Sequence, residues 1–212
     1  MNEIAPKKPR KERKENAERR RRQLLDAARQ SILTHGLAKT TLATVADAAG
    51  LSQGVAVFYF KSKSGLLTET LRDLYQRYEH LWTHALEAAG PDPARQLHAL
   101  IEADFQPAAC GPQTLPLWFA FWGELRFSGT YAEVADSFDD RRRDALCAVW
   151  HALLPVDRKD QADQLAEWMD TLTDGYWQRL HLAPDSFDRA DAMRATKDCI
   201  ARLVPEFDPN RR

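Results

Sequence analysis

The stretch TLATVADAAGLSQGVAVFYF, residues 41–60, decides the fold of the N-terminal part of this chain. Apolar residues follow the i, i+3, i+4, i+7 spacing of one buried helical face, at Leu42, Val45, Ala46 and Ala49. Thr41 is placed to cap this helix, Gly50 to end it in a left-handed conformation, and Ser52 to cap a second helix reaching Phe60. The pattern indicates a helix-turn-helix, whose second helix lies in the major groove of DNA. An ordinary helical hairpin inside a core has the same pattern, so the surrounding sequence must decide.

The charge distribution favours the DNA-binding alternative. The chain carries 30 Lys and Arg against 31 Asp and Glu. Residues 1–63 hold 14 of these basic residues and 6 of the acidic ones, which leaves 16 and 25 for the rest. A basic N-terminal part joined to an acidic body is typical of a protein whose N-terminal part binds a polyanion such as DNA.

Composition narrows the protein class. With 212 residues, of which 44% are hydrophobic, the chain can bury a core. It has no apolar run long enough for a membrane span, and its polar N-terminus lacks the apolar segment of a signal peptide. Three widely spaced cysteines, Cys110, Cys147 and Cys199, favour reduced thiols and a cytoplasmic protein without a membrane partner.

The N-terminal part divides into an arm and a domain. Residues 1–16 are polar and basic, and we expect a disordered arm that attracts phosphates, reaches the minor groove, or only keeps the protein in solution. Residues 17–62 are expected to form a three-helix DNA-binding domain, with a first helix over 17–36 that ends at Gly36.

The remainder, residues 63–206, is expected to be a larger helical bundle, followed by a tail at 207–212. No segment alternates with period two, so the predicted fold class is all-α with about nine helices. Proline and glycine clusters separate the predicted helices, at 63–89, 94–107, 114–127, 130–154, 160–182 and 188–204.

The residues of the N-terminal domain resemble the tetracycline-repressor (TetR) family of bacterial transcription regulators. The matching residues are Ala46, Gly50, Ser52, Gly54, Tyr59, Phe60, Lys63, Leu66 and Leu67. The resemblance implies a homodimeric repressor that binds double-stranded DNA and is released from a palindromic operator by a small ligand. Its two recognition helices would face successive major grooves about 34 Å apart, or a multiple of that distance.

Two aromatic segments, LPLWFAFWGELR at 115–126 and DGYWQR at 174–179, resemble the choline-responsive (BetI-type) branch of this family. This implies choline or a related quaternary ammonium compound as effector and a link to the glycine betaine pathway. Members often have Tyr or Ser where this chain has Val57, and His where it has Phe58, so the operator sequence does not carry over.

Major-groove recognition needs side chains near the start of the second helix. Gln53 can bond a base edge, Gly54 permits close approach, and Val55 and Val57 can touch thymine methyl groups. For Phe58 both base contact and packing are open, whereas Phe60 is expected to hold the helix on the scaffold. Phosphate contacts are expected from threonine, tyrosine and lysine side chains. The predicted DNA-binding residues are Thr41, Thr44, Ser52, Gln53, Gly54, Val55, Val57, Phe58, Tyr59 and Lys63.

The acidic body holds all six tryptophans, at 82, 118, 122, 150, 168 and 177. Aromatic faces beside a carboxylate form a cage for a quaternary ammonium group. The predicted ligand-binding residues are Phe105, Trp118, Phe121, Trp122, Asp174 and Trp177. Aromatic residues at helical spacing are also ordinary core, and a different lipophilic drug or metabolite is the alternative effector.

The last two predicted helices are expected to form the dimer interface as a four-helix bundle between subunits. Their apolar stripes are Leu165, Trp168, Met169, Leu172 and Tyr176 on one helix, and Met193, Ile200, Leu203 and Val204 on the other. These stripes can equally pack within one subunit.

Motifs of catalysis are missing from the sequence. There is no G-x-S-x-G, P-loop or G-x-G-x-x-G motif. His80 and His84 are four residues apart but lack the glutamate of a zinc protease motif, so no metal, cofactor or catalytic residue is expected. A helical-bundle enzyme with an incidental basic head is the remaining alternative.

Overall fold

The structure is a computed structural model that describes residues 10–207. Positions 1–9 of the predicted arm and 208–212 of the predicted tail lie outside the described residues. Residues 10–16, expected to be disordered, belong instead to the first helix, α1 (Arg10–Lys39). The sequence after Pro9 is rich in Lys, Arg and Glu, which are good helix formers. Gly36, with φ 76° and ψ 170°, interrupts α1 where the helix was predicted to end.

The described residues form ten α-helices and two short 3₁₀ helices without a strand, which confirms the all-α class. After α1 the elements are α2 (Leu42–Ala48), α3 (Gln53–Phe60), α4 (Lys63–Ala89), α5 (Pro93–Asp104), α6 (Pro107–Cys110), α7 (Leu115–Leu125), α8 (Gly129–Leu153), η1 (Val156–Gln161), α9 (Ala162–Leu182), α10 (Arg189–Leu203) and η2 (Pro205–Phe207). The short α6 was read as a loop because Pro107 was taken for a helix breaker, yet proline is well suited to the first turn of a helix.

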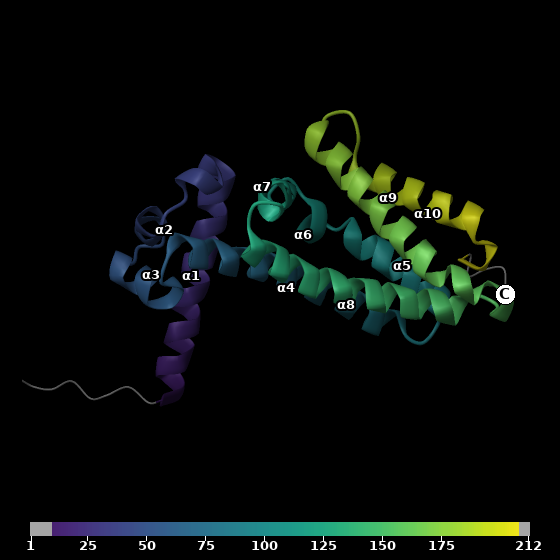
Figure 1. The fold of residues 1–212 in the computed structure, drawn as a ribbon, viewed down its shortest axis with the longest axis horizontal. Helices are drawn as coiled ribbons and strands as arrows, with labels where there is room; N and C mark the ends of the chain where they lie inside the picture. The colour runs from purple at the N-terminus through teal and green to yellow at the C-terminus, as the bar shows by residue number, and fades with distance from the viewer. Residues whose placement is uncertain (1–9, 208–212) are drawn as a thin grey trace, which may run out of the picture. The chain divides into compact units, whose positions relative to one another are not determined.

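The chain divides into two compact units within α4, after Asp73 (Figure 1). The predicted boundary, between residues 62 and 63, falls about three helical turns earlier. The difference arises because the first turns of α4 pack with α1, α2 and α3, and Leu66 of α4 is fully buried in their shared core. That core contains Leu24, Leu25, Ala28, Val45, Ala46, Ala56, Phe60 and Leu66.

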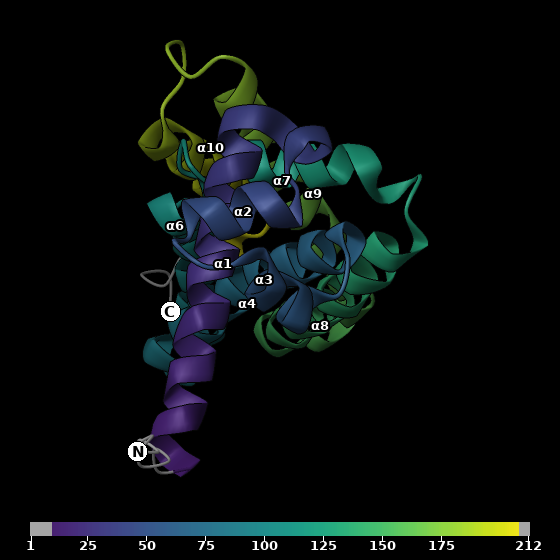
Figure 2. The ribbon, with the colours of Figure 1, turned by 90° about the vertical axis from the view of Figure 1, so that its left-hand side faces the viewer.

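Ion pairs from two arginines connect α1 to α4 inside the first unit. Arg21 pairs with Glu69, and Arg22 Nη1 lies 3.2 Å from Asp73 Oδ1. Figure 2 shows α2 and α3 beside α1, in the arrangement of a helix-turn-helix. The core therefore holds α3 by one face and leaves its other face to solvent.

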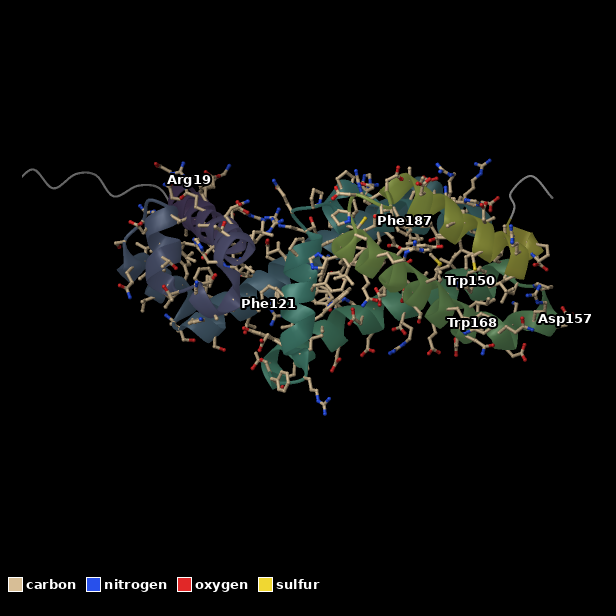
Figure 3. The ribbon with its side chains drawn as sticks, turned by 90° about the horizontal axis from the view of Figure 1, so that it is seen from above. Arg19, Phe121, Trp150, Asp157, Trp168 and Phe187 are labelled. Carbon is tan, nitrogen blue, oxygen red and sulfur yellow. The ribbon has the colours of Figure 1, made fainter. Side chains whose placement is uncertain are left out.

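In the second unit, α8 packs against α9 and α5, and α10 packs against α9 and α5 (Figure 1). Phe121 of α7 is fully buried, whereas Trp168 of α9 keeps 46% of its surface exposed (Figure 3). Within the described part of the chain, no helix has the length and apolar character needed to cross a membrane.

Candidate DNA-binding and effector sites

Hydrogen bonds fix both ends of α2. At its start, the Thr44 N–H donates to Thr41 Oγ1 (3.2 Å) and the Thr41 N–H donates to Thr44 Oγ1 (3.0 Å). At its end, Gly50 has φ 65°, its N–H donates to the Asp47 carbonyl, and the Leu51 N–H donates to the Ala46 carbonyl. These last two bonds form a Schellman motif, which ends a helix sharply.

Helix α3 presents a two-sided surface. Ala56 and Phe60 are buried, so the predicted packing role of Phe60 is confirmed. On the opposite side Gln53 and Gly54 are exposed, and Val57 and Phe58 keep 40% and 67% of their surface exposed. Large apolar side chains so exposed on a short helix mark a surface that a partner covers.

Val55 and Tyr59 lie between these two faces. Both side chains are half-buried and pack against the core of the first unit, so only part of each is exposed to solvent. Ser52 stands at the N-cap position of α3 as predicted but makes no capping bond with its side chain. Its exposed hydroxyl is therefore not used by the helix.

The predicted phosphate contacts Thr41 and Thr44 spend their hydroxyls on the capping box of α2. Lys63 donates from Nζ to the carbonyl of Ala38, joining the start of α4 to the end of α1. An ammonium has three donors, so this bond leaves two for a phosphate. Lys61, two residues before Lys63, has φ 65° and donates from Nζ to the Phe58 carbonyl.

In the second unit, side chains from α4, α7, α8 and α9 line a cavity of about 370 Å³, which we call the effector cavity. Its lining residues are Tyr75, Tyr78, Trp118, Trp122, Leu125, Asp139, Arg142, Asp170, Thr173, Asp174 and Trp177. Four of the six residues predicted from the sequence meet here: Trp118, Trp122, Asp174 and Trp177.

The aromatic rings of the cavity form one cluster. The ring centroids of Trp118, Trp122 and Trp177 are 5.8–6.3 Å apart, and the planes of Trp122 and Trp177 differ by only 11°. Tyr75 lies 4.8 Å from Trp118, and Tyr78 lies 5.5 Å from Trp177, both edge to face. Five electron-rich rings thus surround one space.

The other two predicted ligand-binding residues, Phe105 and Phe121, do not line this cavity. Phe121 is fully buried and meets Tyr131 edge-on at 5.6 Å. Phe105 follows the end of α5 and packs near Tyr176. Both are buried in the core of the second unit.

Sequence reasoning missed the charged residues contributed by α8, since no local spacing links them to the tryptophans. Arg142 Nη2 lies 3.0 Å from each carboxylate oxygen of Asp104, and Tyr78 donates to Asp104 at 2.7 Å. Trp177 Nε1 donates to the backbone carbonyl of Asp104. Burial raises the pKa of Asp104 to about 6, against the opposing effect of Arg142. The pair holds Arg142, which lines the cavity, against α5.

Three further carboxylates, those of Asp139, Asp170 and Asp174, face the cavity. Asp139 and Asp174 are exposed to solvent, yet partial desolvation by the surrounding protein and the charge of Asp170 raise their pKa values to about 6 and about 7. Arg142 is the only cation in the described lining, and it is already paired with Asp104. The cavity therefore favours a positively charged occupant.

A second hollow, the α9–α10 groove, runs along the outer side of the last two helices. It is lined by Trp168, Thr171, Leu172, Gly175, Tyr176, Arg179, Cys199, Ile200 and Leu203. The predicted apolar stripes thus divide: Leu165, Met169 and Val204 are buried within the subunit, whereas Trp168 and Leu203 are 46% exposed.

Other candidate chemistry is weak. The rings of His80 and His84 are 6.3 Å apart, and the described residues contain no group of three His, Cys, Asp or Glu that could hold a metal. Cys110 is buried in α6, and burial raises its pKa to about 12. Cys147 and Cys199 are partly exposed.

Family comparisons match both units. The model of bacterial regulatory proteins of the tetR family matches residues 24–70, and that of the BetI-type transcriptional repressor C-terminal domain matches residues 93–205. The HTH-type transcriptional regulator BetI of Burkholderia lata is 34% identical over 187 residues, covering 88% of this chain and 95% of its own length. The same regulator of Burkholderia mallei is 33% identical over 88% and 94%.

Solved structures share the fold. A transcriptional regulator from Pseudomonas aeruginosa PAO1 superposes with a TM-score of 0.78 at 24% identity, over 88% of this chain and 90% of its own. A transcriptional regulator from Saccharomonospora viridis, solved in complex with choline, has a TM-score of 0.71 at 19% identity, over 85% and 94%. The matched families and relatives regulate transcription and are not enzymes. The chain is therefore a member of the TetR family of DNA-binding transcriptional repressors, with a C-terminal domain of the BetI type.

Proposed function

We propose that this repressor binds a palindromic operator as a homodimer and is released from it by a small quaternary ammonium compound, with choline as the leading candidate. The observation that carries the proposal is the effector cavity, where five aromatic rings and three carboxylates beyond the Arg142–Asp104 pair surround one space.

The physical argument for a quaternary ammonium effector rests on its hydration. Such a cation has no N–H donors and is attracted to the faces of Trp and Tyr rings, most strongly where water is excluded. Trp118 and Trp177 are almost fully buried, and Trp122 is half-buried at the opening. Asp139 and Asp174 supply the counter-charge beside these rings. A neutral lipophilic effector would leave their charges unmatched.

Two relatives support the same effector class. The choline complex of the Saccharomonospora viridis regulator shows that a protein of this fold can hold choline. The curated relatives of Burkholderia lata and Burkholderia mallei carry the name BetI. For this chain, choline remains the proposal to be tested.

For the dimer, the α9–α10 groove is the proposed subunit interface. It joins exposed Trp168 and Leu203 across two neighbouring helices, and a two-fold axis would bring the same surface of each subunit together. Two recognition helices then face one side of the duplex.

For DNA, the exposed face of α3 is the proposed reading surface. Gln53 is free for a base edge, Gly54 lets the backbone approach, and Val57 and Phe58 offer apolar contacts to thymine methyl groups. Lys61 and Lys63, near the start of α4, are the proposed phosphate contacts.

Release is proposed to pass through α4. This helix contributes Leu66 to the core of the DNA-binding unit and Tyr75 and Tyr78 to the effector cavity. Suppose that α4 has two conformations, which place Tyr75 and Tyr78 differently in the cavity. A cation that binds one of these conformations more tightly shifts the equilibrium toward it, to an extent set by the difference in affinity.

The test is a fluorescence anisotropy titration of the full chain against labelled DNA from upstream of its own gene, at several salt concentrations, with and without choline. We expect salt-dependent binding that choline weakens. Loss of DNA binding only with a different lipophilic cation would support the alternative effector. Absence of any specific binding at low salt would contradict the proposed operator.

A further inference from the structure

The outer face of α3 carries few hydrogen-bonding groups. Gln53 and Tyr59 are the two residues of this helix whose side chains can donate or accept a hydrogen bond. Tyr59 is half-buried beside the core, whereas Val57 and Phe58 keep 40% and 67% of their surface exposed. The helix therefore presents apolar side chains to a partner, beside the exposed amide of Gln53.

The aromatic ring of Phe58 lies beside Lys61, the residue that ends α3. Lys61 Nζ is 5.3 Å from the ring centroid and donates to the Phe58 carbonyl at 2.9 Å. The ring also meets the ring of Tyr59 edge to face, with their centroids 5.2 Å apart. Because the ammonium is attracted both to the ring and to the carbonyl, these contacts limit the positions that the Phe58 side chain can take.

The backbone of Lys61 is strained. It has φ 65° and ψ −46°, a region that residues with a Cβ atom rarely adopt. Glycine would end the helix here with less strain, so a lysine at this position indicates that its side chain has a use. That side chain contacts Phe58 through both the ring and the carbonyl, which makes Lys61 a positioning residue for the ring.

The chain belongs to a family of DNA-binding repressors, so this face is expected to meet double-stranded DNA. In the major groove, base edges expose mainly hydrogen-bonding nitrogen and oxygen atoms, and thymine adds a methyl group. An apolar side chain that covers a donor or acceptor removes its water without replacing the hydrogen bond, which costs free energy. Covering a methyl group has no such cost and is favourable.

We infer that the face formed by Val57 and Phe58 recognises the 5-methyl group of a pyrimidine, with Lys61 positioning the ring of Phe58. The inference rests on the proposed role of α3 as the reading helix, and it makes the methyl group, rather than a pattern of donors and acceptors, the feature that is read. Uracil lacks this methyl group and should not replace thymine at the contacted positions. By contrast, 5-methylcytosine carries the group on the same ring atom and should keep a contact that cytosine lacks.

Fluorescence anisotropy titrations of the full chain test the inference with two duplexes from upstream of its own gene. One contains thymine and the other contains uracil, so they differ only in methyl groups. We expect the uracil duplex to bind about fourfold more weakly for each contacted methyl group, which corresponds to the burial of one methyl group.

Single uracil substitutions then locate the contacted positions. At such a position, a G·C pair that contains 5-methylcytosine should bind more tightly than the same pair with cytosine, by about the same factor. This comparison restores the methyl group on a different base, so it separates recognition of the methyl group from recognition of thymine as a whole.

A variant of Phe58 separates a direct contact from an effect of the methyl group on DNA shape. Phe58→Ala should lower the ratio of thymine-duplex to uracil-duplex affinity several-fold, whereas an effect through DNA shape would persist in this variant. Phe127→Ala is the matched control, because Phe127 is 79% exposed but lies in the second unit. The melting temperature of each variant, followed by circular dichroism, verifies that it is folded.

A variant of Lys61 tests its positioning role. Lys61→Gly keeps the positive φ and removes the ammonium, so the protein should be at least as stable as the wild type. We expect the ratio of thymine-duplex to uracil-duplex affinity to fall. A lysine that only contacted phosphates would weaken binding to both duplexes equally, because their phosphates are the same, and would leave the ratio unchanged.

Each result decides a different point. Equal affinity for the thymine and uracil duplexes overturns methyl recognition but leaves operator binding standing. A ratio that Phe58→Ala does not change, or that Phe127→Ala changes equally, overturns the contact made by Phe58. An unchanged ratio in Lys61→Gly overturns the positioning role of Lys61. If the thymine duplex is not bound specifically even at low salt, the proposed operator and methyl recognition fail together.

Discussion

Two glycines near the recognition helix have opposite reasons to be glycine. A Cβ atom on Gly54 would meet only Ser52 Oγ, at an ordinary contact distance of 3.8 Å. A Cβ atom on Gly65 would lie 2.1 Å from the backbone oxygen of Phe60. The protein's own packing therefore requires Gly65 but not Gly54, and the bare surface of Gly54 is available for DNA.

We predict that Gly54→Ala stabilises the protein by about 0.5–1 kcal/mol, because alanine favours a helix, while lowering operator affinity by roughly tenfold. Gly65→Ala should instead lower the free energy of unfolding by about 1–3 kcal/mol through the clash with Phe60. Chemical denaturation and DNA titration measure the two quantities. Unchanged DNA affinity in Gly54→Ala would show that the backbone does not approach DNA there.

We predict that Asp174 makes the proposed cation binding depend on pH. Desolvation and the neighbouring carboxylates, Asp170 first among them, raise its pKa from 3.8 to about 7, so it is largely protonated at pH 6. A bound cation favours the ionised form, so choline affinity should rise as pH increases from about 5.5 to 8. Without a bound cation, the stability of the protein changes in the opposite direction to the choline affinity. Because the raised pKa makes ionisation of Asp174 costly in the folded state, the free energy of unfolding falls over the same rise in pH.

Asp174→Asn removes both effects of this group. We expect weaker choline binding at pH 8 and a shallower dependence on pH, with the remaining slope due to Asp139, whose pKa is raised to about 6. Calorimetry at three pH values is the measurement. A variant with the wild-type pH profile would place the titrating group elsewhere.

At the level of single residues, the sequence could reveal only part of the effector cavity. Trp118 and Trp122 are four residues apart on one helix, so their shared face could be predicted. Arg142 and Tyr75 reach the same space from α8 and α4, and only tertiary packing brings them there. Phe105 and Phe121 were indistinguishable from cage residues, because composition does not tell which face of a helix meets a cavity.

Among the elements, the helix-turn-helix was the most predictable, because its determinants are local. The capping box of Thr41 and Thr44, the positive φ of Gly50 and the buried face of α2 all follow from neighbouring residues. The start of α1 was not predicted, since a run of charged residues suits both a helix and a disordered arm. The division within α4 was also missed, because Leu66 packs with residues distant in the sequence.

The cap of α2 offers a test at this scale. Thr41→Ala removes the acceptor for the Thr44 N–H and should lower the free energy of unfolding by about 1 kcal/mol. Thr41→Ser keeps the hydroxyl and should retain most of the stability. If both variants lose DNA affinity while Thr41→Ser keeps its stability, Thr41 contacts DNA through more than its cap.

For the whole molecule, the proposed function depends on pairing two DNA-binding units. One unit offers only α3 to a major groove, whereas two held by a common interface bind half-sites together and gain from the high effective concentration of the second. The α9–α10 groove is distinct from the effector cavity, although α9 lines both. Dimerisation can therefore be disrupted without touching the cation site.

We predict that Trp168→Glu yields a folded monomer, because it places a charge in the middle of the apolar groove. Analytical ultracentrifugation should show the change in mass. Affinity for an operator with two half-sites should fall by about 100-fold or more, whereas affinity for DNA with a single half-site should stay close to that of the wild-type protein. Phe127→Glu is the control, since Phe127 is 79% exposed but lies outside the groove. Calorimetry with choline should give similar affinities for both variants, because neither residue lines the effector cavity. A dimeric Trp168→Glu protein would move the interface to another face, and a monomer that still bound the full operator tightly would remove the need for paired recognition helices.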